Sequence, residues 1–166
     1  MTNLPAPQKK HPLDEPVSIV LGLFTIAVIV WVVTKGPLPD LSPWLYIVWI
    51  ITLAIGVNLG ISFESSDANF ANLIVTAAFL AVGLAPATLI TFVGMSLGEV
   101  LRITFPDQFR SRHRTPWRTL VVFFSNLSVY VLSLIAGGAL YLALGGEAPS
   151  PLLNTDKIAN VTFAPL

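Results

Sequence analysis

The sequence predicts an all-α protein, a polytopic bundle of five transmembrane helices, and three observations support this fold class. Of the 166 residues, 54% are hydrophobic and 11% are charged, whereas a soluble domain carries about 25% charged residues. The apolar residues gather in five segments, most of them close to the roughly 20 residues that a helix needs to cross a bilayer. Glycines and polar residues recur at helical spacing inside these segments, as expected of helices that pack together in lipid.

The five segments follow one another with short connections. The first is too long for the apolar region of a signal peptide and lacks a cleavage site of small residues. The third is short, and only Ala85 and Pro86 separate it from the fourth, which predicts a tight helical hairpin or a re-entrant pair. The expected spans are residues 16–34, 43–63, 68–84, 87–105 and 117–144. Around this membrane domain of residues 16–144, we expect an N-terminal arm over residues 1–15. Residues 145–166 are expected to form an external tail or the approach to a missing sixth span.

The positions of lysine and arginine predict the topology, because short basic segments stay on the cytoplasmic side of a membrane. Lys9 and Lys10 precede the first span. Arg102 ends the fourth span, and a basic loop follows it that contains Arg110, Arg112, Arg114 and Arg118. In a five-span bundle both regions lie on the same side. The N-terminus is therefore expected in the cytoplasm and the C-terminal tail outside.

Small and polar residues predict the packing surfaces of the bundle. A GxxxG pattern lets two helix backbones approach closely in lipid. Two such pairs occur, Gly56 with Gly60 in the second span and Gly94 with Gly98 in the fourth. On the fifth span, steps of three, four and seven place one set of small and polar residues on a common face: Thr119, Asn126, Tyr130, Ser133 and Gly137.

Ionisable and amide groups inside the spans are the candidate functional residues, because they are costly in lipid and often mark a site. These residues are Glu99, Arg102, Asn58 and Asn126. Glu99 and Arg102 are three residues apart, so they can meet on one face of a helix. We favour a structural ion pair near the cytoplasmic interface over ligand or proton sensing. We also expect Glu99→Gln and Arg102→Gln to cost comparable stability.

The remaining residues give no indication of catalysis. The two histidines, His11 and His113, lie in expected loops, so no span offers a histidine ligand to a haem or chlorophyll. The chain has no cysteine, which excludes thiolate metal sites and cysteine nucleophiles. The net charge is zero, and no phosphate-binding loop or serine-centred motif is present. We therefore expect no enzyme activity, cofactor, metal or nucleic-acid partner.

The chain resembles the N-terminal multi-pass sensor region of bacterial HD-type phosphohydrolase and GGDEF diguanylate cyclase proteins. The resemblance rests on GISFESSDANFANLIVTAAFLAVGLAPATLITFVGMSLGEVLR and WRTLVVFFSNLSVYVLSLIAGGALYLALGG, about two thirds of the chain. The shared features are a polar turn, a short span, a helical hairpin, a glycine-containing span ending in Arg102, and Gly145-Gly146 after the last span. The resemblance implies a location in the bacterial inner membrane and a cytoplasmic output domain, which in this family follows a sixth span and would therefore be encoded beyond Leu166.

Three functions remain open at this stage. The leading interpretation is the sensor or input part of a bacterial signalling protein, embedded in the lipid bilayer and coupled to a cytoplasmic output domain. The second is a small accessory subunit packed against other membrane subunits. The third is the substrate-binding component of an energy-coupling-factor transporter, which has a similar glycine-rich pattern of short spans. An accessory subunit loses order without its partners, whereas a transport component binds a small molecule on its own.

Overall fold

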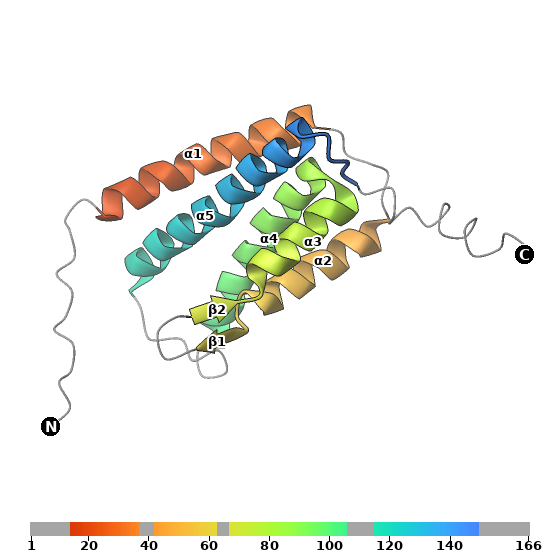
Figure 1. The fold of residues 1–166 in the computed structure, drawn as a ribbon. Helices are drawn as coiled ribbons and strands as arrows, with labels where there is room; N and C mark the ends of the chain where they lie inside the picture. The colour runs from red at the N-terminus through yellow and green to blue at the C-terminus, as the bar shows by residue number, and fades with distance from the viewer. Residues whose placement is uncertain (1–13, 37–41, 63–66, 106–114, 150–166) are drawn as a thin grey trace, which may run out of the picture.

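The structure is a computed structural model that describes residues 14–36, 42–62, 67–105 and 115–149. These residues form five helices and two short strands, arranged side by side (Figure 1). The elements are α1 (Asp14–Lys35), α2 (Pro43–Gly56), β1 (Gly60–Ser62), β2 (Asp67–Asn69), α3 (Ala71–Val82), α4 (Leu84–Thr104) and α5 (Pro116–Ala143). The expected helical class is confirmed. Three helices are long and apolar enough to cross a membrane: α1, α4 and α5.

Helices α1 and α5 run in the same direction along one side of the bundle (Figure 1). At their beginnings, the indole nitrogen of Trp117 donates a 3.0 Å hydrogen bond to the Glu15 carboxylate. Further along, Gly22 of α1 packs against Phe124 of α5 through its backbone alone. A Cβ on Gly22 would lie 2.5 Å from the phenylalanine side chain. The missing side chain therefore sets the close approach of the two helices.

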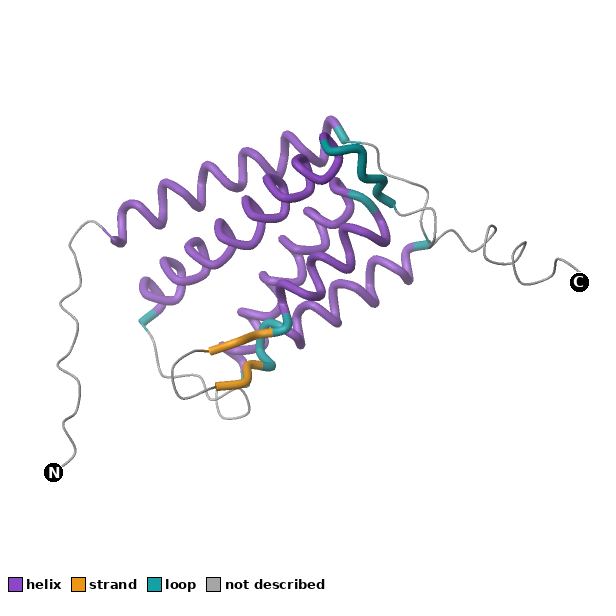
Figure 2. Tube along the Cα trace, in the orientation of Figure 1, coloured by secondary structure: helices purple, strands orange, loops and turns teal. Residues whose placement is uncertain are grey.

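Helix α2 ends seven residues earlier than the apolar run predicts. It stops at Gly56, and residues 60–62 pair with residues 67–69 as a two-stranded antiparallel ladder (Figure 2). In this register Gly60 is paired with Asn69. Gly56 and Gly60 therefore do not form a helical GxxxG pair, and the second span predicted over residues 43–63 is wrong beyond Gly56.

The turn between α3 and α4 is even tighter than expected. Gly83 alone separates the two helices, with a φ of +89°, a backbone conformation that glycine adopts readily. Ala85 and Pro86 do not separate the spans, because both lie in the first turn of α4. A proline fits there because the first N–H groups of a helix have no intrahelical partner.

Helix α4 occupies the centre of the bundle and contacts each of the other four helices. Its Ile90 and Ala87 belong to a core with α2, α3 and α5, while its Met95 packs with residues of α1 and α5. The outward faces of the other helices stay apolar. Val20 on α1, for example, is 67% exposed and Trp44 on α2 is 73% exposed. Exposed apolar faces around a buried central helix suit a membrane environment.

Candidate functional site

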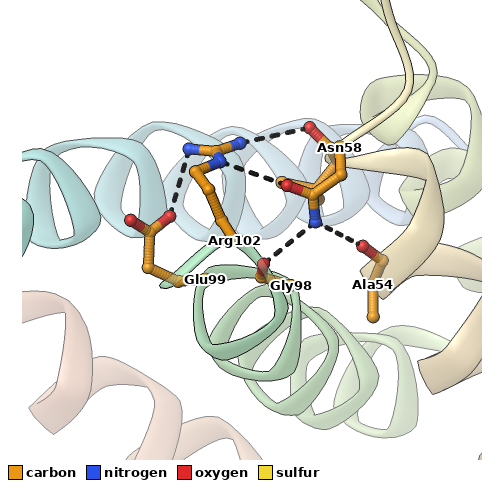
Figure 3. A network of polar contacts seen from close by, with 6 residues as sticks. Ala54, Asn58, Gly98, Glu99 and Arg102 are labelled. Atoms are coloured by element: carbon orange, nitrogen blue, oxygen red, sulfur yellow. Dashed lines mark hydrogen bonds and ion pairs between the residues drawn. The ribbon is translucent and has the colours of Figure 1, made fainter. Parts of the chain in front are cut away.

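The predicted polar residues Asn58, Glu99 and Arg102 meet at one end of the bundle, beside the two strands (Figures 1 and 3). Asn58 lies just after the end of α2, while Gly98, Glu99 and Arg102 lie in the last two turns of α4. Helices α2 and α4 are direct neighbours along the bundle. We call the group of Asn58, Gly98, Glu99 and Arg102 the α2–α4 polar network.

Asn58 connects the two helices through its side-chain amide. Its Nδ2 donates to the carbonyl of Ala54 at 2.8 Å and to the carbonyl of Gly98 at 2.9 Å. Ala54 is among the last four residues of α2, whose carbonyls have no partner within a regular helix. The same amide therefore satisfies a free carbonyl at the end of α2 and also bonds α2 to α4.

Arg102 closes the network from the α4 side (Figure 3). Its Nε donates to Asn58 Oδ1 at 3.1 Å, and one terminal nitrogen donates to Glu99 Oε2 at 3.1 Å. The other terminal nitrogen lies 3.5 Å from the carbonyl of Val57. The Arg102 side chain is 20% exposed and that of Glu99 is 12% exposed. The guanidinium thus links the carboxylate of its own helix to the end of α2 while remaining mostly buried.

Glycines on α4 make this contact sterically possible. A Cβ on Gly98 would lie 3.1 Å from the Ala54 carbonyl oxygen, and a Cβ on Gly94 would lie 2.9 Å from the Leu53 side chain. Both distances are shorter than ordinary van der Waals contacts. The predicted GxxxG pair of Gly94 and Gly98 therefore lies at a helix–helix contact, and its partner is α2.

Other predicted site residues lie elsewhere. Asn126 is half-buried in α5, distant from the network in sequence and with no hydrogen bond to its side chain in the described part of the chain. Gly137 faces open space, since a Cβ there would meet nothing within 4 Å, so it is not at a contact between the described helices. Arg118 is exposed in the first turn of α5. Three basic-loop residues lie outside the described residues: Arg110, Arg112 and Arg114.

One buried polar contact, between α1 and α5, was not predicted from the sequence. Thr25 of α1 and Ser128 of α5 are both fully buried, and their hydroxyl oxygens are 3.0 Å apart. Ser128 donates to the Phe124 carbonyl at 2.7 Å. The Thr25 hydroxyl also lies 2.8 Å from the Leu21 carbonyl of its own helix, so its single proton is shared between that carbonyl and Ser128. Gly22 and Thr25, three residues apart in an otherwise apolar span, are the signal that marks this face of α1.

The network has the chemistry of a structural connection. Glu99 contributes one carboxylate oxygen to Arg102, and the three guanidinium nitrogens of Arg102 point to Asn58, Glu99 and the Val57 carbonyl. Among the residues that the structure describes, no group of three histidine, cysteine, aspartate or glutamate side chains could hold a metal ion. No buried side-chain nitrogen or oxygen in this described part lacks a hydrogen bond.

These observations define the class of the protein: a helical protein with three helices fit to span a membrane and a polar network between two of its helices. Comparison with models of protein families, with curated proteins and with solved structures finds no significant match. The resemblance to bacterial sensor regions therefore stays a prediction from the sequence.

Proposed function

We propose that the protein is a non-catalytic integral membrane module that crosses the bacterial inner membrane five times and serves as the input part of a signalling system. The directions of the helices support five crossings, because each helix runs opposite to the one before it (Figure 1). Helix α2 has 14 residues and α3 has 12, which at 1.5 Å per residue gives about 21 and 18 Å. These two helices therefore reach across a bilayer only together with the strands and turns that follow or precede them.

The observation that carries this proposal is the α2–α4 polar network. It joins the end of α2, next to the strands, to the helix that contacts every other helix of the bundle. A displacement of the strands or of α2 therefore reaches α4 directly through Asn58 and Arg102. The next segment along the chain is the basic stretch of residues 106–114, which in the proposed topology faces the cytoplasm.

The test compares signalling with stability in cells that express the full chain. The resemblance implies an output that makes or degrades a cyclic dinucleotide, so the measurement is the cellular level of cyclic diguanylate. Asn58→Leu is expected to shift this level relative to wild type, while Ser96→Ala is the control. Ser96 also lies on α4, but its hydroxyl bonds only to the Phe92 carbonyl of its own helix.

Two results would count against an input role. The first is an unchanged cyclic diguanylate level after deletion of the whole protein. The second is recovery of the protein only within a larger membrane complex, with loss of order when detergent removes the partners. That second result supports the accessory subunit, which the apolar outward faces of α1 and α2 also favour.

A further inference from the structure

The two sides of the bundle have apolar spans of different length. Between the charged residues Glu15 and Lys35, α1 has 19 uncharged residues, which gives about 28 Å at 1.5 Å per residue. Between Pro43 and Asn58, α2 and the residue after it contribute 14 residues, or about 21 Å. Helix α3 has 12 residues, or about 18 Å. The side formed by α2 and α3 is therefore shorter than α1 by about 7–10 Å.

The difference in length lies at the end of the bundle next to the strands. At the other end, α1 ends and α2 begins at about the same level (Figure 1). Gly36, directly after α1, is packed there against Ala85 in the first turn of α4, since a Cβ on Gly36 would lie 2.6 Å from the Ala85 Cβ. The helices thus share one level away from the strands, and α2 stops short of the level at which α1 begins.

Polar groups occupy the level at which α2 stops. The α2–α4 polar network lies there, with the charged side chains of Glu99 and Arg102 12% and 20% exposed. Strands β1 and β2 follow, and within the described part of the chain they pair only with each other, so each has an outer edge. Open sheet edges that face lipid do not occur in the hydrocarbon of a membrane. On this side of the bundle the hydrocarbon therefore ends near Asn58.

We propose that α2 and α3 form a short apolar face that fits a locally thin bilayer, and that this face binds phospholipids with short acyl chains in preference to long ones. A typical hydrocarbon core of about 30 Å matches α1 but exceeds the apolar length of α2 by about 9 Å. A bilayer thins beside a short span at a small free-energy cost per Å, whereas intramembrane charges are expensive. This inference rests on the five crossings of the proposed function and not on its signalling output.

The surface of α2 suits acyl chains. Residues 44–57 contain no charged residue. The large hydrophobic side chains that α2 exposes are Trp44, Leu45, Ile47, Val48, Ile51 and Ile55. The polar network at the end of α2 is satisfied within the chain, because no buried side-chain nitrogen or oxygen of the described residues lacks a hydrogen bond. The short side thus offers apolar contact along its length and a polar boundary at its end.

The absence of cysteine from the chain allows a direct test of the level at which the hydrocarbon ends. Leu59→Cys, just after α2, is compared with Val20→Cys on α1, at positions that are 54% and 67% exposed. Leu59 is 16 residues after Pro43 and Val20 is 15 residues before Lys35, so each lies about 22–24 Å from the level shared by the helices. The full-length variants are placed in vesicles of dioleoyl phosphatidylcholine and phosphatidylglycerol, with a charged maleimide on both sides of the membrane. Because the thiolate that reacts forms in water, Leu59→Cys is expected to react, whereas Val20→Cys stays protected until detergent is added.

A second measurement tests the preference for short chains. Two full-length variants retain one tryptophan each, Trp44 on α2 or Trp31 on α1, with the other three replaced by phenylalanine; these two side chains are 73% and 63% exposed. Fluorescence quenching by brominated phosphatidylcholine, in competition with dimyristoleoyl or dierucoyl phosphatidylcholine, gives the relative binding constants of the two lipids beside each tryptophan. At Trp44 the short-chain lipid is expected to bind about 3-fold or more tightly than the long-chain lipid, the factor that a small cost per Å gives over a mismatch of about 7–10 Å. At Trp31 the preference is expected to be smaller.

Three outcomes would overturn the proposal. Protection of both cysteines would place the end of α2 in a bilayer of full thickness. Equal chain-length preference at the two tryptophans would mean that water reaches Leu59→Cys without thinning of the bilayer beside α2. Reaction of both cysteines would show that α1 does not cross the membrane, which also contradicts the five crossings of the proposed function.

Discussion

Asn58→Leu is the substitution that best tests whether the α2–α4 polar network stabilises the fold. Leucine has the same branching and the same number of side-chain heavy atoms as asparagine but makes none of its three hydrogen bonds, to the Ala54 carbonyl, the Gly98 carbonyl and Arg102 Nε. A bond between neutral groups contributes about 1 kcal/mol and a bond to a charged group about 1.5–3 kcal/mol. Within membranes the average is about 0.6 kcal/mol. The three bonds together therefore predict a loss of about 2–4 kcal/mol in the free energy of unfolding.

The assay is reversible unfolding in mixed micelles, followed by fluorescence of the four tryptophans. Protein is kept dilute in micelles so that association of chains does not contribute. The chain supplies a matched control, Asn126→Leu, which makes the same chemical change where no hydrogen bond among the described residues is lost. We expect its free energy of unfolding to stay within about 0.5 kcal/mol of wild type, as for substitutions away from specific contacts. Equal losses for the two variants would refute the assignment of Asn58 as the link between the helices.

Three further predictions use the same assay. Gly98→Ala is expected to lower the free energy of unfolding by about 1–3 kcal/mol, because the added Cβ meets the backbone of α2. Gly137→Ala is expected to be neutral or stabilising in monomers, because alanine favours helix. Equal effects of the two substitutions would contradict the packing of Gly98 against α2. Arg102→Gln is expected to lower the free energy of unfolding more than Glu99→Gln does, because of the two side chains only Arg102 reaches α2. A larger loss for Glu99→Gln would contradict this prediction. Thr25→Val is expected to cost about 0.6–1 kcal/mol through its buried hydrogen bond, and no loss would show that packing alone joins α1 to α5.

The long helices were predictable because length and hydropathy alone determine them. The first expected span, residues 16–34, corresponds to α1 at Asp14–Lys35, and the fifth, residues 117–144, corresponds to α5 at Pro116–Ala143. The pairing of Glu99 with Arg102 followed from helical spacing and is present. These features depend on residues that are neighbours in sequence.

The end of α2 was not predictable in this way. The residues after Gly56 remain largely apolar, and hydropathy does not distinguish a continuing helix from a turn and a short strand. Asn58 stabilises the end of the helix through residues 40 and 44 positions further along the chain. Such a contact has no local signal. For the same reason the sequence did not predict that Arg102 has a stronger connection to α2 than Glu99 has.

The buried face of α5 shows a second limit. Of the predicted face, Tyr130 packs against both cores, whereas Ser133 and Gly137 are exposed. The side that the bundle covers carries Ser128 and Gly138 instead. Each side offers small and hydroxyl-bearing residues, so composition alone does not indicate which one meets α1 and α4. The covered side is determined by Gly22 and Thr25 of α1.

Two asparagines in apolar surroundings therefore have opposite roles in the structure. Asn58 uses its amide donor twice and its acceptor once, all within the chain. Asn126 uses neither within the described residues, although it lies deeper in a helix fit to span a membrane. Asn126 therefore adds no hydrogen bond to the fold among the described residues, which is why Asn126→Leu is the matched control for Asn58→Leu. The place of an asparagine relative to a neighbouring helix, and not its residue type, thus decides whether it stabilises this bundle.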